Sequence, residues 1–491
     1  MRLASKKILS ILSSAPTVRP PSTTLSVRGL PVRRAVTYLV LLLLAVYLLA
    51  DAPKHHVATA TDGGDEFIAK EVVVQLASTS DLPAIASRYS LDPNPLDQFG
   101  TRPIFRLRIT DSASVQDRVN ALSQDSRVVF VEPNFILKPP VGGGNTWSVG
   151  NTWSVGNTWS VGGDYGTYVS QWAPQTIHLD RAHQVNRGFG PNGPIKIAVL
   201  DTGVDKTHPA LSGHLMPGWD FVDNDNDPSE VGDQTTGPYG HGTHVAGLIA
   251  LVAPDAKIIP VRVLDVHGIG NIWVLAEALA YAVNPDGDPG TADGADVINL
   301  SLSTLRQTKL IGGLLAKACG GDSSVDLPVS PNPYLVVVAA AGNGGDSTKQ
   351  YPAAESVDGL IAVAASTVND TLASFSTRAS WVQVAAPGEA ILSTVPNGQY
   401  GTWSGTSMAT PIVAGEAALV RATFPSLSNK DLARHVTRMS VKIDGDVPYR
   451  VDAGIALTTN PENYSSPSPT PTPTPSPSPT PTPTKTRKGR N

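Results

Sequence analysis

The sequence predicts an α/β protein whose main domain is a doubly wound, mostly parallel β-sheet preceded by a smaller α+β domain. Between residues 165 and 457, apolar runs without polar alternation are separated by helical segments, which is typical of strands buried on both faces of a parallel sheet. Between residues 65 and 138, strand-like runs alternate with two helical segments. The 491-residue chain is longer than one ordinary domain, and its 41% apolar content is enough for a sizeable core.

The N-terminal segment, residues 1–64, combines a basic flank with an uncharged apolar run. Several Lys and Arg residues precede residues 35–50, AVTYLVLLLLAVYLLA. This arrangement is typical of an export signal or of a membrane anchor with its N-terminus inside the cell. The run is long for a signal peptide and short for a spanning helix, so a cleaved and an uncleaved form both stay open. We expect a secreted or cell-envelope protein, with the membrane as a partner if the helix is retained.

Residues 65–138 are predicted to form the small α+β domain. Its strand-like runs are EVVVQL, PIFRLRI and VVFVEPNF, at 71–76, 103–109 and 128–135. Helical segments follow the first two runs, and Ser114 is placed to cap the second helix. Strand, helix, strand, helix, strand with antiparallel pairing predicts an α+β sandwich of ferredoxin type.

Residues 139–164 form a linker that contains the hexapeptide NTWSVG three times in succession, at 145–162. Flanking glycines and the lack of a hydrophobic period predict a loop. Neutral duplication in the gene and a binding platform of Trp side chains both stay open as explanations. At the other end, residues 458–491 alternate Pro with Ser or Thr before a short basic end, which predicts an extended spacer. This tail is either simply solvated or a tether to an anionic envelope surface.

The domain at 165–457 carries its polar motifs where strands end or helices begin. The predicted strands are at 196–201, 257–265, 295–303, 335–343, 359–367 and 381–387, and the predicted helices are at 241–253, 273–284, 407–424 and 431–440. In such a sheet, ligands bind at the carboxyl ends of the strands. We therefore expect the functional residues there.

Four residues at these positions have the chemistry of nucleophilic catalysis. Asp201 ends a strand in LDTGVD, His241 begins a helix in GHGTHVAG, and Ser407 begins another helix in SGTSMATP. A Ser nucleophile needs a base to take its proton, and an Asp can orient a His for that task. Asn343, in AAAGNGG, can donate a hydrogen bond to the oxyanion of a tetrahedral intermediate.

Each motif alone has another interpretation. DTG also marks aspartic proteases, but these need a second such loop, and the sequence has no second DTG or DSG. HGTH is also an i, i+3 pair of metal ligands, although no further ligand lies close in sequence. GTSMA is close to the nucleophile elbow of α/β hydrolases, which requires a His after the Ser, and His435 alone follows Ser407. Taken together, the motifs follow the order Asp, His, Ser along the chain, and this order favours a catalytic triad over the other interpretations.

The four blocks LDTG, HGTHVAG, AAGN and GTSMATP resemble the signature blocks of the subtilisin-like serine proteases (subtilases), and Asp, His, Ser is the known order in subtilisin. GWDFVDND at 218–225, VRVLD at 261–265 and FSTRAS at 375–380 resemble the thermitase-like branch. The resemblance covers about residues 165–457. The domain before it resembles the subtilase propeptide, a chaperone and intramolecular inhibitor.

The resemblance implies a serine endopeptidase that acts through an acyl-enzyme, with Ser407 as nucleophile, His241 as general base and then acid, Asp201 as orienting residue and Asn343 as oxyanion donor. It further implies that polypeptide substrates bind as an added strand between two edge segments. The matching positions are Gly268, Ile269, Gly270, Ser301, Leu302 and Ser303. The enzyme is expected to be an exported zymogen that cuts its own linker at 139–164 and thereby frees the protease from its propeptide.

The resemblance also bears on calcium. A stretch in which thermitase-like enzymes bind calcium carries four carboxylates here, those of Asp220, Asp223, Asp225 and Asp227. Oxygen-rich clusters suit Ca²⁺, so we predict a weak calcium site, with a solvated acidic loop as the alternative. The chemistry itself needs no cofactor.

Composition excludes several other classes. A net charge of −5 provides no basic surface for nucleic acid, and the single cysteine, Cys319, excludes an intrachain disulfide. We expect a monomer. Two rival functions stay open: a subtilase fold that only binds peptides, and a subtilase that joins peptides. Non-catalytic relatives usually lose a triad residue or the oxyanion Asn, and all four are present here.

Overall fold

The computed structural model describes residues 59–62, 65–140, 152–153, 157–158, 160–234, 237–288, 291–323, 325, 327 and 329–461. The chain divides into two units, Met1–Val57 and Ala58–Asn491, and every described residue belongs to the second. The predicted signal or anchor helix at 35–50 and the tail from residue 462 onward lie outside the described residues. Among those that are described, no helix is both long enough and apolar enough to cross a membrane.

The large domain, residues 160–461, is built on a nine-stranded sheet in the order β12-β13-β11-β15-β16-β17-β18-β22-β21. Neighbouring strands are parallel except for β21 and β22, which confirms the predicted mostly parallel sheet. Most residues of the central strands are buried, because helices cover both faces. The strands are β11 (Lys196–Asp201), β12 (Trp219–Asp220), β13 (Lys257–Arg262), β15 (Val297–Leu300), β16 (Val336–Ala340), β17 (Leu360–Ser366), β18 (Val384–Pro387), β21 (Ser440–Lys442) and β22 (Tyr449–Val451).

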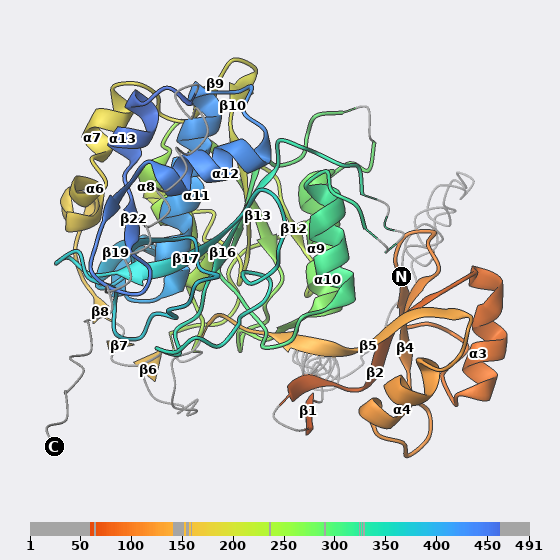
Figure 1. Cartoon of the computed structure of the whole chain (residues 1–491). Helices are drawn as coiled ribbons and strands as arrows, with labels where there is room; N and C mark the ends of the chain where they lie inside the picture. The colour runs from red at the N-terminus through yellow and green to blue at the C-terminus, as the bar shows by residue number, and fades with distance from the viewer. Residues whose placement is uncertain are drawn as a thin grey trace, which may run out of the picture. The chain divides into compact units, whose positions relative to one another are not determined.

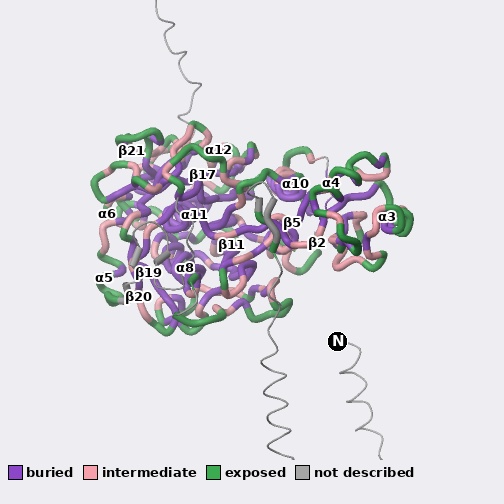
Figure 2. The backbone as a smooth tube through the Cα atoms, turned by 90° about the horizontal axis from the view of Figure 1, so that it is seen from below, coloured by how far each residue is buried: buried purple, intermediate pink, exposed green. Residues whose placement is uncertain are grey.

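The helices of the large domain lie in two layers (Figure 1). Alternate strand residues, such as Ile197 and Val199, pack against α8 (His241–Val252) and α11 (Thr406–Thr423). The residues between them, such as Ala198 and Leu200, pack against α9 (Ile272–Val283) and α10 (Lys309–Ala318). The buried residues therefore lie on both faces of the sheet (Figure 2). The remaining elements are α5 (Tyr165–Ser170), α6 (Trp172–Thr176), α7 (Leu179–His183), β9 (Phe189–Gly190), β10 (Gly193–Pro194), η2 (Pro209–Leu211), β14 (Gly270–Asn271), β19 (Ile391–Val395), β20 (Gln399–Trp403), α12 (Asn429–Arg438) and α13 (Ala453–Thr458).

The small domain, residues 65–140, has a sheet in the order β5-β2-β4-β3, with every neighbouring pair antiparallel. Its elements are β2 (Asp65–Leu76), η1 (Thr79–Asp81), α3 (Leu82–Arg88), β3 (Asp97–Gln98), β4 (Ile104–Arg108), α4 (Val115–Leu122) and β5 (Val128–Leu137), and β1 (Thr59–Asp62) pairs with β2. The β-α-β-β-α-β order is that of a ferredoxin-like unit. The sequence did not predict β3, because a two-residue strand is too short to show a hydrophobic period.

The sequence predicted a loop for the whole linker, but the described part of the linker contains short paired strands. β6 (Thr152–Trp153) pairs with β7 (Asn157–Thr158), and β8 (Ser160–Val161) pairs with β20 of the large domain. Two-residue strands of this kind form where an existing strand offers an unpaired edge, which a local sequence pattern does not reveal. The chain therefore enters the large domain as a strand on the β19–β20 hairpin.

Candidate active site

Asp201 and His241 meet where β11 ends and α8 begins. His241 Nδ1 lies 2.7 Å from Asp201 Oδ1, and both side chains are buried. Asp201 Oδ1 also accepts a hydrogen bond from the Thr202 backbone N–H at 2.7 Å. If the Nδ1–H of the ring donates to Asp201, the lone pair of the imidazole is on Nε2, as a general base requires.

The second His of the HGTH motif points to a different part of the molecule. His244 Nε2 lies 3.2 Å from the Ile391 carbonyl oxygen and 3.1 Å from that of Gly401. Burial lowers the pKa of His244 to about 3, so the ring is neutral. Trp403, which the sequence analysis did not single out, stacks on His244 with ring centroids 4.8 Å apart and on His241 with centroids 6.0 Å apart. These contacts give His244 a structural role and do not make a metal-ligand pair of His241 and His244.

Ser407 is the second residue of α11, and Ser301 at the end of β15 holds its backbone. Pro411 has no N–H, so it cannot donate to the Ser407 carbonyl four residues earlier in the helix. The Ser301 hydroxyl takes over this role and donates to Ser407 O at 3.0 Å. The Ser407 hydroxyl in turn lies 3.4 Å from the Ser301 carbonyl oxygen. Ser407 is thus fixed at the N-terminal end of a helix, where the helix dipole favours negative charge.

Asn343 follows β16, and its side-chain amide is oriented by the residue before Ser407. Its Oδ1 accepts from the Thr406 backbone N–H at 2.8 Å and from the Thr406 hydroxyl at 2.9 Å. The amide Nδ2 therefore faces the other way, and it donates to the Pro140 carbonyl oxygen at 2.7 Å. The Asn343 amide holds a carbonyl at the last described residue of the small domain.

The end of the small domain lies along both predicted substrate-binding segments. Leu137 pairs with Gly270 in an antiparallel bridge, and Lys138 pairs with Ser303 through two hydrogen bonds of 3.0 and 2.7 Å. A Cβ atom on Gly268 would lie 3.5 Å from Pro139 Cδ. Ile269 belongs to the same turn, with its carbonyl accepting from Asp265 N at 3.0 Å. Leu302 is fully buried in the core of the large domain, so its side chain has no place in the cleft.

Two further side chains of β5 bind the N-termini of helices in the large domain. The Glu132 carboxylate accepts from the backbone N–H groups of Lys309 and Leu310 at 2.8 and 3.0 Å, in the first turn of α10. Asn134 Oδ1 accepts from Trp273 N in α9 at 3.3 Å. Burial raises the pKa of Glu132 to about 7, while these N–H donors act in the opposite direction. The small domain is therefore attached by polar side chains as well as by strand pairing.

Comparison with known proteins places this architecture in a family. The model of the subtilase family matches residues 193–462, more than half of the 491-residue chain. The chain belongs to the subtilase family. It is 36% identical over 354 residues to the thermophilic serine proteinase of Bacillus sp. (strain AK1), covering 70% of this chain and 75% of the relative. It is 41% identical over 291 residues to thermitase of Thermoactinomyces vulgaris, covering 57% of this chain and 91% of thermitase.

The fold comparison agrees with this assignment. The solved structure of fervidolysin from Fervidobacterium pennivorans matches with a TM-score of 0.62 at 23% identity, covering 82% of this subtilase and 62% of that chain. At this identity the match shows the fold alone. The family assignment confirms the resemblance predicted from the motifs, and the protein is a serine endopeptidase that acts on polypeptides.

Two of the four carboxylates predicted to bind calcium in this subtilase share an arginine. Arg262 Nη1 lies 2.6 Å from Asp220 Oδ2 and 2.8 Å from Asp223 Oδ2, and so provides the positive charge that these two require. Asp225 Oδ1 caps the Asp227 backbone N–H, and Asp227 pairs with Lys206 at 2.6 Å. Within the described ranges, no three His, Cys, Asp or Glu side chains form a group that would hold a metal ion. These residues do not fit calcium, because an arginine buried in the protein replaces the cation.

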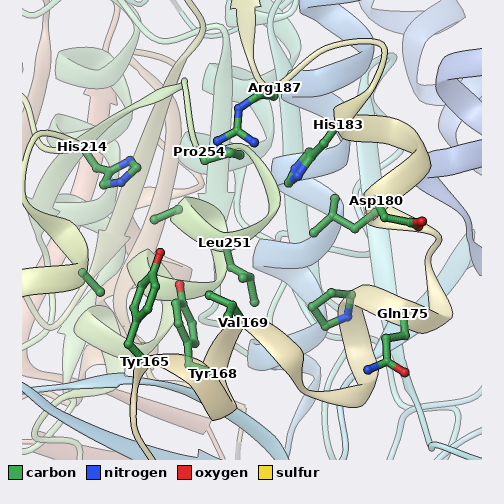
Figure 3. Close-up of a pocket in the computed structure, with 14 residues that line it drawn as sticks. Tyr165, Tyr168, Val169, Gln175, Asp180, His183, Arg187, His214, Leu251 and Pro254 are labelled. Atoms are coloured by element: carbon green, nitrogen blue, oxygen red, sulfur yellow. The ribbon is translucent and has the colours of Figure 1, made fainter.

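A pocket of about 400 Å³ lies at the far end of α8 (Figure 3). It is lined by residues of α5, α6 and α7 and by the C-terminal end of α8, with Tyr165, His183, Arg187 and His214 around Leu251. Leu251, which lines the pocket, comes ten residues after His241 in α8, on the order of 15 Å along the helix axis. The pocket is therefore separate from the site around Asp201, His241 and Ser407.

Proposed function

We propose that this subtilase is made as a zymogen, and that Asp201, His241 and Ser407 cut its own chain between Pro140 and Val141. The observation that carries the proposal is the hydrogen bond of 2.7 Å from Asn343 Nδ2 to the Pro140 carbonyl oxygen. This carbonyl is held by the predicted oxyanion donor, which also bonds the residue before the predicted nucleophile, and such a carbonyl is the one that would be attacked. Antiparallel pairing of the preceding residues with Gly270 and Ser303 supports the same alignment.

The reaction follows from the roles proposed for these residues. Ser407 Oγ attacks the Pro140 carbonyl carbon while His241 takes the hydroxyl proton, and Asp201 stabilises the imidazolium. Negative charge then develops on the Pro140 oxygen, where Asn343 Nδ2 and the N-terminal end of α11 stabilise it. The Pro140–Val141 bond breaks as His241 gives its proton to the Val141 nitrogen, leaving Pro140 as an ester on Ser407. Water then releases Pro140 as a carboxylate by the same steps in reverse order.

We further propose that the small domain stays bound after the cut as an inhibitor. Residues 136–138 pair with the segments proposed to bind substrate, and the Glu132 and Asn134 contacts do not depend on the cut bond. The cleaved domain then blocks the cleft until it dissociates or is degraded. This accounts for a small domain that is attached through both its backbone and its side chains.

The test is the intact mass of the full chain over time after purification, for the wild type and for Ser407→Ala. We expect the wild type to split into a fragment that ends at Pro140 and one that begins at Val141, and Ser407→Ala to stay whole. Ser428→Ala, which removes a serine that caps α12, is the matched control and is expected to split like the wild type.

Other outcomes decide against the proposal. If both chains stay whole and neither cleaves an added polypeptide, the protein is the peptide-binding rival. If both chains split alike, a contaminating protease has cut the linker. Products that have gained the mass of an added amine nucleophile would instead indicate the peptide-joining rival.

We also infer export from the basic flank and the apolar run at 35–50. If that helix is retained, the cut after Pro140 frees the large domain from the membrane. Fractionation of expressing cells should then show residues 1–140 in the membrane and the large domain in the medium. A mature protease still joined to the residues before Leu137 would contradict this inference.

A further inference from the structure

The helix that begins at His241 has no side chain at its own capping position. Gly240, its N-cap residue, has φ 91°, and a Cβ there would lie 2.6 Å from Pro396 Cδ. A residue with a capping side chain therefore does not fit, although the first N–H groups of a helix need acceptors. Gly242 N instead donates to Thr202 Oγ1 at 2.9 Å, and Thr243 N donates to Glu230 Oε1 at 3.0 Å.

Glu230 supplies the acceptor from a loop that precedes the helix by 10 residues. Its Oε1 atom accepts from the Thr243 N–H at 3.0 Å, from the Thr243 hydroxyl at 3.1 Å and from the Thr202 hydroxyl at 3.1 Å. The residue as a whole is half-buried, but Oε2 is out of contact with solvent and has no hydrogen-bond partner among the described residues. The Glu230 carboxyl group is therefore inside the protein, with its Oε1 atom hydrogen-bonded to Thr202 and Thr243.

Thr202 connects this carboxyl group to the candidate triad. Its backbone N–H donates to Asp201 Oδ1, the oxygen that pairs with His241. Its hydroxyl donates to Glu230 and accepts from Gly242, the residue after His241. One side chain, Glu230, therefore ties the end of β11 to the first turn of α8.

We propose that Glu230 is a positioning residue that holds Asp201 and His241 in register for proton transfer. This deepens the proposed function and rests on it. Glu230 touches neither the substrate nor the reacting atoms; it acts through Thr202 and Thr243. Proton transfer depends on sub-ångström placement of the base, so loosening this connection lowers turnover more than substrate binding.

Because Glu230 can gain or lose a proton, its positioning role should also change the pH dependence of activity. Burial raises the pKa of Glu230 to about 7, and the Asp201 carboxylate contributes in the same direction, whereas the backbone N–H groups of Thr243 and Gly240 and the Thr202 hydroxyl act in the opposite direction. Tyr239 also faces this group, since Glu230, Asp205 and Asp233 all contribute to the raised pKa of that phenol. Glu230 therefore gains its negative charge near neutral pH, where histidine-dependent catalysis switches on. A negative charge beside Asp201 favours the imidazolium that forms during the reaction.

The test compares Glu230→Gln and Glu230→Ala in the full chain, with kcat and KM measured on a peptide substrate from pH 5 to 10. The concentration of active enzyme is measured by titration with a serine-reactive fluorophosphonate, so that kcat refers only to molecules with an assembled active site. Glu230→Ala should lower kcat about 10- to 100-fold and leave KM within about twofold. Glu230→Gln keeps an oxygen acceptor, so it should recover most of kcat at pH 8. The acidic limb of its kcat/KM profile should move by about half a pH unit toward lower pH.

Glu416→Gln is the matched control, because Glu416 is also a buried carboxyl with a raised pKa, but its charged neighbours are Asp452 and Arg450. It should leave both kcat and the pH profile unchanged. An unchanged kcat in Glu230→Ala, or an unmoved acidic limb in Glu230→Gln, overturns the proposal. If the Glu230→Ala chain does not mature, the pH profile of Glu230→Gln alone decides whether Glu230 is a positioning residue. Failure of the wild type to react with the fluorophosphonate would instead overturn the proposed function, whatever the Glu230 variants do.

Discussion

In the large domain, Asp201 and Asn343 are held by Thr202 and Thr406 of the same domain, whereas in the small domain Glu132 and Asn134 find partners in helices of the other domain. The candidate active site is therefore complete within the large domain. The Glu132 carboxylate and the Asn134 amide oxygen would lose these partners if the two separated and would then be solvated by water, while Asn134 Nδ2 would keep its bond to Glu71. This difference agrees with the proposed role of the small domain as a removable inhibitor.

The largest expected effect tests whether Asp201 acts in catalysis together with His241 and Ser407. Asp201→Asn should lower kcat about 10⁴-fold, because an amide in this place favours the wrong histidine tautomer while filling the same volume. The rate of the cut after Pro140 in the full chain, followed by intact mass and expected to fall by the same factor, measures it, because so slow a variant does not mature itself. Asp255→Asn, at a half-exposed carboxylate paired with Arg187, is the matched control and should retain full activity. A loss below tenfold in Asp201→Asn would remove Asp201 from the catalytic group.

The second prediction concerns the point where the two domains meet at Asn343. Asn343→Ala should lower kcat about 100- to 1000-fold, because the oxyanion loses one donor. The same variant should also slow the first-order cut after Pro140, since the bond to the Pro140 oxygen is lost. Single-turnover mass measurements on the full chain test both statements. A normal self-cut together with slow peptide hydrolysis would show that Asn343 does not serve the two reactions in the same way.

The third prediction tests the small domain's dependence on the large one. Glu132→Ala removes the acceptor of two backbone N–H groups, and hydrogen bonds to a charged group are worth about 1.5–3 kcal/mol each. After the cut, the small domain should therefore inhibit peptide hydrolysis about 100- to 10,000-fold more weakly, without a change in kcat of the freed enzyme. Asp92→Ala, at an exposed carboxylate of the small domain, is the control. Equal inhibition by both variants would contradict a role for Glu132 in docking.

The smallest expected effect concerns Glu416, a buried carboxyl group of the large domain that lacks hydrogen bonds of the kind that hold Asp201 and Asn343. Glu416 in α11 is fully buried, and neither of its carboxyl oxygens has a hydrogen-bond partner in the described part of the chain. Burial, with the Asp452 carboxylate, raises the pKa of Glu416 well above its ordinary value of 4.5. Glu416→Leu should therefore stabilise the protein by about 1–3 kcal/mol at pH 8, and Glu416→Gln by less.

The pH dependence of this last effect has a definite sign. Folded wild type keeps the Glu416 proton, whereas the unfolded chain loses it near pH 4.5, so its contribution to stability is fully present below pH 4.5 and falls as pH rises toward the raised pKa. The advantage of Glu416→Leu should accordingly grow from pH 4 to pH 8. Melting temperatures of Ser407→Ala chains, which cannot digest themselves, measure it. A difference that is constant with pH would show that Glu416 keeps its charge in the fold.

Much of the fold and of the candidate site could be predicted from local patterns. The buried strands of the large domain lack alternation, and the motifs around Asp201, His241, Asn343 and Ser407 lie at strand ends and helix starts, which is enough to expect them at one edge of the sheet. One contact of the acidic residues from Asp220 to Asp227, which argues against the predicted calcium site, could not be seen in the sequence. Spacing shows which carboxylates are near one another in sequence, but not that Arg262, some forty residues away, would lie between two of them.

The sequence by itself determined the doubly wound sheet, the order of the catalytic motifs and the presence of a separate small domain, because periodicity and motif order are local properties of the chain. Tertiary structure alone decided that the Pro140 carbonyl meets Asn343 and that β5 pairs with Gly270 and Asn271 of the large domain. It also decided that Glu230 caps the helix of His241. Each of these depends on a contact between residues distant in sequence, and such contacts are set by packing and hydrogen-bond satisfaction across the whole fold.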